Sequence, residues 1–215
     1  MEDKLLDGSG GSTKGIGVFH AWKTAVVDYG FKPTMISGIS VSALMMVAFA
    51  LGKYKELEEL MANFTIDYIF EHSPVNKKGK PAVRAVFRAV TGCSSLGKMT
   101  PLVDILKELV TEEDFAKYQS GDEYAKCFSM SVDFRSGARI FTNMKTVKSY
   151  EEFIKYSIAS ASVPVFTEPV IYDGRVLYDG GVRDHSIAHW MVENFAITEV
   201  FSVWTRPKNY DISIP

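Results

Sequence analysis

Cysteine is scarce in this sequence, because Cys93 and Cys127 are the only two among 215 residues. Their spacing fits neither a metal-binding nor a redox motif, so we expect two reduced thiols and no disulfide framework. Long hydrophobic runs are also missing, since residues 43–51 are well short of the roughly 20 residues of a membrane-spanning helix. With no signal peptide at the start of the chain, these absences predict a cytoplasmic protein, at most peripheral at a membrane.

Neither sign of charge dominates. The sequence has 24 Lys and Arg residues against 26 Asp and Glu residues, and its net charge is −2. This balance argues against a nucleic-acid partner and against disorder. No internal repeat or low-complexity tract is present, and 47% of the residues are hydrophobic. The length and composition predict one domain, residues 1–215, with a sizeable buried core.

One turn has the pattern of a catalytic serine. Residues 35–44 read as a short strand, a tight turn at Ser40 and a buried helix. Gly38 and Ser42 are small, as a nucleophile elbow requires where its strained turn brings strand and helix together. The usual elbow has glycine in place of Ser42, so a purely structural turn serine is the alternative. Ser37 and Ser42 are weaker candidates for the nucleophile, because neither lies at the apex of the turn.

A glycine-rich loop, residues 8–15, precedes the first predicted helix. Its glycines, including Gly10 and Gly11, allow successive backbone N–H groups to face one concavity. Such amides at the start of a helix can hold a phosphate or an oxyanion. The order Thr-Lys-Gly at residues 13–15 does not match a Walker A loop, and the loop does not match a dinucleotide-binding fingerprint.

The third motif follows a predicted β-hairpin. Two apolar runs flank Asp173-Gly174, a typical two-residue turn, and the second run ends at Asp179-Gly180-Gly181. The two glycines permit a sharp turn and leave space beside the carboxylate. Asp173 is used by the hairpin turn and Asp184 lacks flanking glycines, so Asp179 is the carboxylate that this pattern singles out.

The rest of the chain alternates strands with helices, which indicates an α/β fold. The expected strands cover residues 5–6, 35–37, 127–134, 139–142, 170–172, 175–178 and 200–204. The expected helices cover residues 16–29, 44–51, 54–70, 102–110, 149–160 and 187–194. Residues 53–120 are expected to form a mainly helical insertion that can cover the active site.

A basic stretch lies within that insertion. Residues 72–103 contain no acidic residue, and residues 77–98 carry six lysines and arginines beside an apolar stripe. Such a segment can make peripheral contact with an anionic membrane. The alternative is a solvated helix face over the core, which is the commoner meaning of a charge run.

Taken in order, the three motifs resemble those of the patatin-like phospholipases. Bacterial members of that family show a Gly-Gly-Gly-x-Lys/Arg-Gly loop, a Gly-x-Ser-x-Gly elbow and an Asp-Gly-Gly/Ala motif. The matching segments here are residues 10–15, 38–42 and 179–181, and residues 157–166 also resemble the family. The resemblance spans about residues 5–205. It implies a three-layer α/β/α sandwich with a central, mostly parallel sheet.

The resemblance also implies a Ser–Asp dyad in a lipid acyl hydrolase of phospholipase A or lysophospholipase type, without metal or cofactor. Ser40 would attack the ester of a phospholipid or lysophospholipid and form an acyl-enzyme, while Asp179 accepts the proton. Backbone N–H groups of Gly10, Gly11 and Ser12 would form the oxyanion hole. Gly38 and Ser42 would shape the elbow, and supporting roles fall to Lys14, Gly180 and Gly181.

Ser12 and Ser42 depart from the family pattern, because both stand where the family has glycine. A hydroxyl there can narrow the oxyanion hole or crowd the helix. A catalytically weak or inactive lipid-binding or regulatory module is therefore one alternative. A related acyltransferase or thioesterase using the same residues is another. A Ser–His–Asp triad through His185 or His189 is a third, although both histidines lie on the same loop–helix unit as Asp179.

An acyl chain needs an apolar trough. Aromatic residues, methionines and one isoleucine could supply it, with core filling as the alternative for each: Met45, Met46, Phe64, Ile69, Phe70, Phe87 and Phe166.

Overall fold

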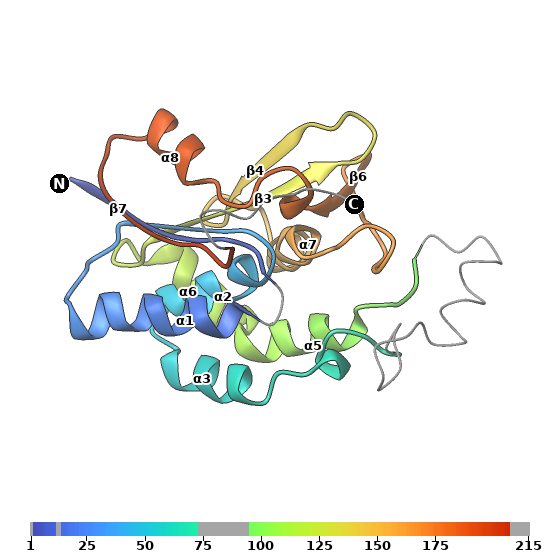
Figure 1. Ribbon diagram of the computed structural model, residues 1–215, viewed down its shortest axis with the longest axis horizontal. Helices are drawn as coiled ribbons and strands as arrows, with labels where there is room; N and C mark the ends of the chain where they lie inside the picture. The colour runs from blue at the N-terminus through green and yellow to red at the C-terminus, as the bar shows by residue number, and fades with distance from the viewer. Residues whose placement is uncertain (1, 12–13, 73–94, 207–215) are drawn as a thin grey trace.

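A seven-stranded sheet runs through the middle of the molecule (Figure 1). The computed structural model describes residues 2–11, 14–72 and 95–206. The strand order is β5-β6-β3-β2-β1-β7, and β4 pairs with β3. Parallel pairing joins β1 (Asp3–Gly8), β2 (Met35–Gly38), β3 (Lys126–Asp133) and β7 (Ile197–Val203). Antiparallel pairing adds β4 (Arg139–Asn143), β5 (Val170–Tyr172) and β6 (Arg175–Asp179).

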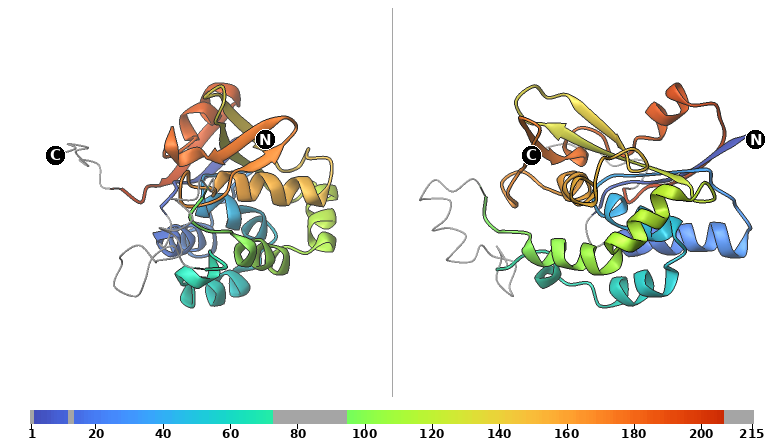
Figure 2. Two further views of the ribbon diagram at one scale, coloured as in Figure 1. Left: turned by 90° about the vertical axis from the view of Figure 1, so that its right-hand side faces the viewer. Right: turned by 180° about the vertical axis from the view of Figure 1, so that it is seen from behind.

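Helices cover both faces of the sheet (Figures 1 and 2). The larger core lies between the sheet and α1 (Gly15–Lys23), α2 (Val41–Ala50), α3 (Tyr54–Ala62), α5 (Thr100–Leu109), α6 (Glu112–Ser120) and α7 (Tyr150–Ser160). A smaller core lies on the other face, under α8 (Ala188–Asn194). The predicted α/β sandwich with its central, mostly parallel sheet is therefore confirmed.

Helix α2 lies at the centre of the larger core. Eight of its ten residues are buried, as its nearly uniform apolar sequence predicts. Its Phe49 ring contacts Trp22 of α1 edge-on, with ring centroids 5.3 Å apart. Burial of each such aromatic side chain stabilises the fold by roughly 1.5–3 kcal/mol. This packing therefore fixes the direction in which α2 leaves the turn at Ser40.

Several predicted boundaries are wrong. The first strand is longer than residues 5–6, because β1 gains partners on both sides from β2 and β7. The predicted helix over residues 54–70 ends as α3 at Ala62, where the Asn63 side chain turns back and donates to the Glu59 carbonyl (2.8 Å). A single 3₁₀ turn, Ile66–Tyr68, follows.

The hairpin turn and the helix-ending glycine are where the sequence places them. Asp173 and Gly174 both have positive φ (49° and 70°), as the two-residue turn between β5 and β6 requires. Gly30 also has positive φ (69°), although the helix before it becomes a π-helix at Thr24–Asp28.

Some predictions fall outside the described residues: Ser12, most of the basic segment (residues 77–94), Phe87 and Cys93. The role of residues 53–120 as a cover stays a prediction. Cys127 is a free, fully buried thiol, and burial raises its pKa to about 12. Over the described ranges, every helix is too short or too polar to cross a membrane.

Candidate active site

Ser40 occupies a strained turn between β2 and α2. Its backbone has φ 58° and ψ −125°, a conformation that residues with a side chain rarely adopt. Such strain costs about 1–3 kcal/mol and persists where the surrounding structure imposes it. A Cβ on Gly38 would lie 2.6 Å from the Ser42 carbonyl carbon, so only glycine allows strand and helix this close. This is the geometry of a nucleophile elbow.

Asp179 is the last residue of β6 and lies near Ser40. The side chain is buried (4% exposed), and its Oδ1 accepts a hydrogen bond from the Gly181 N–H (2.6 Å). The Ser40 side chain lies close enough to the carboxylate to lower its pKa. Burial has the larger effect and raises the pKa of Asp179 to about 6, against the opposing effects of the Gly181 N–H and the Ser40 hydroxyl. The structure thus brings Ser40 and Asp179 together from β2 and β6, the neighbours of β3.

The glycine-rich loop lies directly against Ser40. A Cβ on Gly10 would be 3.3 Å from the Ser40 Cβ. The Gly10 N–H, one of the predicted oxyanion donors, already donates to the His185 carbonyl (3.3 Å). Within the described part of the chain, the Gly11 N–H meets no acceptor.

The N–H of Val41 is a further candidate oxyanion donor, which the sequence analysis missed. Val41 is the first residue of α2, and its N–H also meets no acceptor among the described residues. The signal that could have found it is its place directly after the serine, where an elbow supplies an oxyanion donor.

The Ser42 side chain contacts the glycine-rich loop. Its buried hydroxyl donates to the Ser9 carbonyl (2.8 Å), so it ties α2 to the start of that loop. On the other side of the loop, the Lys14 Nζ donates to the Thr205 carbonyl (3.3 Å), and the Thr205 hydroxyl donates to the Gly10 carbonyl. The side chains of Ser42 and Lys14 therefore both support the glycine-rich loop.

Asp7 is a second buried carboxylate near the site, and sequence reasoning did not single it out. It accepts hydrogen bonds from the hydroxyls of Ser37 (2.6 Å), Ser202 (2.6 Å) and Ser186 (2.7 Å). Burial raises its pKa while these hydroxyls oppose the rise. The cluster joins β1, β2 and β7 to the loop after β6, and so holds the His185 carbonyl in place.

The histidines of the triad alternative do not contact Ser40 or Asp179. The His185 imidazole contacts Arg206, and burial lowers its pKa. His189 is exposed and pairs with Glu193 (3.1 Å). Neither ring is a hydrogen-bond partner of Ser40 or Asp179 in the described residues.

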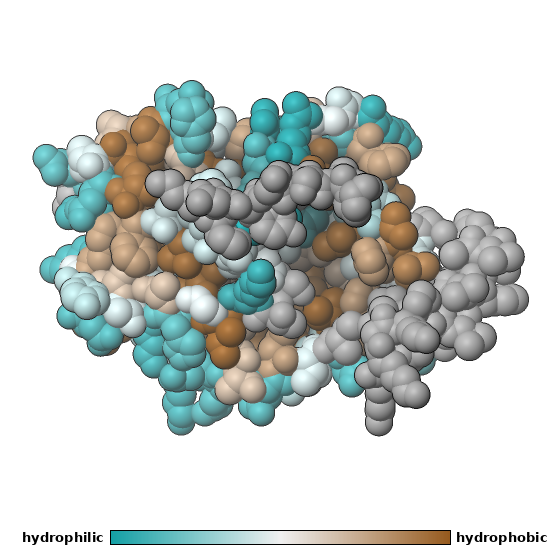
Figure 3. Space-filling model, viewed as in Figure 1, coloured by the Kyte–Doolittle hydropathy of each residue, from teal (hydrophilic) through white to brown (hydrophobic). Residues whose placement is uncertain are grey.

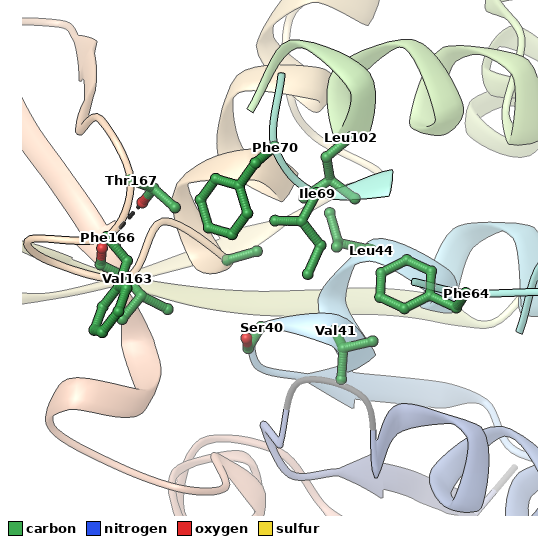
Figure 4. A pocket seen from close by; sticks show the side chains of 11 residues that line it. Ser40, Val41, Leu44, Phe64, Ile69, Phe70, Leu102, Val163, Phe166 and Thr167 are labelled. Carbon is green, nitrogen blue, oxygen red and sulfur yellow. Dashed lines mark hydrogen bonds between the residues drawn. The ribbon is translucent and has the colours of Figure 1, made fainter. Parts of the chain in front are cut away.

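An apolar pocket of about 270 Å³ opens over Ser40 (Figure 4). Its walls come from α2, the segment after α3, α5 and the segment after α7. The lining residues are Ser40, Val41, Leu44, Phe64, Ile69, Phe70, Leu102, Ala161, Val163, Phe166 and Thr167. Four of the expected trough residues are among them, whereas Met46 is fully buried in the core and Met45 lines only a smaller neighbouring cavity of about 20 Å³.

Apolar side chains of the segment after α7, which forms one wall of the pocket, are exposed. Val163, Val165 and Phe166 are exposed to solvent by 39%, 63% and 46%. Hydrophobic residues border a hollow on the face that Figure 3 shows. The residues beside Ser40 therefore suit an apolar substrate better than a charged one.

Comparisons with known proteins agree with this geometry. A family model described as patatin-like phospholipase matches residues 9–189. Twelve chains of solved structures also match, among them VipD from Legionella pneumophila, with a TM-score of 0.55 and 14% sequence identity. That alignment covers 85% of this chain and 46% of VipD, so this chain spans about half the length of that protein. No curated protein matches. Because the family model covers most of the sequence, including Ser40 and Asp179, the chain belongs to the patatin-like phospholipase family.

Proposed function

We propose that this chain hydrolyses carboxylic esters of phospholipids or lysophospholipids through a Ser40–Asp179 dyad. The observation that carries the proposal is the closeness of the Ser40 side chain, held in a strained turn, to the buried Asp179 carboxylate beside an apolar pocket. A carboxylate with a pKa of about 6 is a stronger base than free aspartate, and it is still charged at neutral pH.

In the first half of the reaction, the Ser40 Oγ attacks the ester carbonyl carbon while its proton passes to Asp179. The tetrahedral intermediate then expels the alcohol, which takes the proton back from Asp179, and an acyl-enzyme remains. In the second half, Asp179 accepts a proton from water as the water attacks the acyl group. Release of the fatty acid returns that proton to Ser40.

Main-chain amides stabilise the developing oxyanion. Among the described residues, the N–H groups of Gly11 and Val41 have no acceptor and can donate, and the family resemblance adds Ser12. Gly10 contributes only if its N–H leaves the His185 carbonyl. In comparable sites, each donor of this kind lowers the activation barrier by roughly 2.7–4 kcal/mol.

The pocket volume supports a lipid substrate with one acyl chain inside the pocket. At about 270 Å³, it lies just below the roughly 300–1,000 Å³ of pockets that enclose whole drug-sized ligands. One acyl chain fits beside Ser40, and the remainder of the lipid stays at the exposed apolar mouth.

A fluorophosphonate probe tests the proposal. The probe should label Ser40 in the folded protein, and both the label and fatty-acid release from phospholipid vesicles should disappear in Ser40→Ala. Ser120→Ala, which removes a hydroxyl at the end of α6, serves as the matched control and should keep both. Labelling at a different serine, or fatty-acid release by Ser40→Ala, would contradict the proposal.

A lipid-binding module without turnover is the competing candidate. The pairing of the Gly10 N–H with the His185 carbonyl favours it, because one expected oxyanion donor is occupied. This candidate predicts vesicle binding that Ser40→Ala leaves unchanged and no fatty-acid release above background. Acyl transfer or thioester hydrolysis would use the same residues, and release to added alcohols or from thioesters distinguishes them.

A further inference from the structure

The turn that ends α7 holds the main chain of both dyad residues. The Ser160 hydroxyl accepts a hydrogen bond from the Ser40 N–H (3.1 Å). Two residues later, the Ser162 carbonyl accepts one from the Asp179 N–H (2.8 Å). Ser40 and Asp179 lie on different elements of the fold, so this short segment connects them to one support.

The hydrogen bonds of Ser160 define its orientation. Its side chain is fully buried, and its hydroxyl donates to the Met130 carbonyl on β3 (2.7 Å). A carbonyl cannot donate, so the hydroxyl proton points to Met130 and a lone pair faces the Ser40 N–H. The same carbonyl lies against Gly180, where a Cβ would come within 2.5 Å of its oxygen. Ser160 therefore links the nucleophile to the strand against which the Asp179 turn packs.

The Ser40 conformation depends on such support. A positive φ at a serine persists only where surrounding contacts impose it. The N–H of Ser40 donates to the Ser160 hydroxyl, which is fully buried. Without that acceptor, the Ser40 N–H loses its partner, and the strained turn is free to relax toward a conformation that satisfies it.

We propose that Ser160 is a positioning residue for the nucleophile: its hydroxyl holds the Ser40 main chain so that the Oγ faces Asp179. The inference rests on the proposed hydrolysis. Ser160 does not line the pocket, whereas the next residue, Ala161, does. Loss of the hydroxyl should therefore lower kcat and leave KM unchanged. The expected fall is up to about 100-fold, as for small displacements of reacting groups.

Ser157 provides a matched control on the same helix. It lies one turn before Ser160 and is equally buried, but its hydroxyl has no hydrogen-bond partner among the described residues. Ser157→Ala removes the same atom from the same core without leaving a polar group unpaired. It should keep wild-type kcat and KM.

The test compares Ser160→Ala with Ser157→Ala on a soluble ester, alongside thermal unfolding and the rate of fluorophosphonate labelling at Ser40. Ser160→Ala should show lower kcat, unchanged KM and slower labelling. If Ser160→Ala does not fold, Ser160→Cys replaces it, since its thiol is a weak donor and acceptor and should give a smaller fall in kcat.

Equal kcat in wild type and a folded Ser160 variant, with labelling at Ser40 intact, would overturn the inference and leave the proposed function standing. A rise in KM with unchanged kcat would also overturn it. Absence of hydrolysis and of Ser40 labelling in the wild type would overturn both.

Discussion

Replacing Asp179 by asparagine should stabilise the protein and abolish its activity. Burial raises the pKa of this carboxyl from 3.8 to about 6, so the folded state holds the charged form against a desolvation cost. At about 1.36 kcal/mol for each pKa unit, the rise corresponds to about 3 kcal/mol. Asparagine keeps an oxygen that can accept from the Gly181 N–H but carries no charge, so the cost is removed.

The sign of the pH dependence follows from the raised pKa. Between 3.8 and about 6 the folded state binds the proton more tightly than the unfolded state, so the free energy of unfolding falls as pH rises through this window. Asp179→Asn lacks this contribution. Its advantage over the wild type should therefore be small in acid and reach about 3 kcal/mol at pH values above about 7. Asp7, the other buried carboxyl, is the same in both proteins and cancels in the difference.

Urea unfolding of both proteins in an acidic and a mildly alkaline buffer measures this difference. In parallel, kcat/KM of the wild type on a soluble ester should rise with pH and reach half its plateau near pH 6, where Asp179 becomes charged. Three results would refute the reasoning: a variant no more stable than wild type in alkaline buffer, appreciable activity without the carboxylate, or a half-maximum far from pH 6.

Further substitutions test the loop, the elbow and the pocket. Gly10→Ala should slow probe labelling of Ser40, because its Cβ would come within 3.3 Å of the serine Cβ. The control Gly17→Ala has open space around its Cβ, and it should keep the labelling rate and stabilise α1 by about 0.5–1 kcal/mol. Equal labelling rates in the two variants would contradict this prediction. Ser42→Ala should lower the free energy of unfolding in urea by about 1–3 kcal/mol, since a buried loop carbonyl loses its donor; an unchanged midpoint would argue against that role. Phe64→Ala should join the 270 Å³ and 20 Å³ cavities and shift the best p-nitrophenyl ester to longer acyl chains, and an unaltered chain-length profile would refute this.

The sequence predicts the features of the site that depend on neighbouring residues. The elbow at Ser40 follows from small residues two positions either side of it, and the hairpin that delivers Asp179 follows from its Asp-Gly turn. These signals are local because steric constraints on a turn act within a few residues. The strand order then brings the ends of β2 and β6 to either side of β3.

The hydrogen-bonded supports could not be predicted in this way. Ser160 meets the Met130 carbonyl, and Asp7 meets Ser202, only after the chain has folded. A serine that holds a catalytic loop has the same sequence appearance as a surface serine, since its partner lies far along the chain. Strand length fails for a related reason: β1 extends beyond its two leucines because pairing on both sides compensates for weak local preference.

The position of Thr205 has a consequence for synthesis on the ribosome. This residue follows the last strand, yet its hydroxyl and carbonyl hold the glycine-rich loop near the first. Translation delivers Ser40 early and Thr205 late, so the loop cannot reach its final place until nearly the whole domain has left the exit tunnel. Under the proposed function, a nascent chain would carry Ser40 without the completed glycine-rich loop beside it, and ester cleavage would begin only after the two ends of the domain have met.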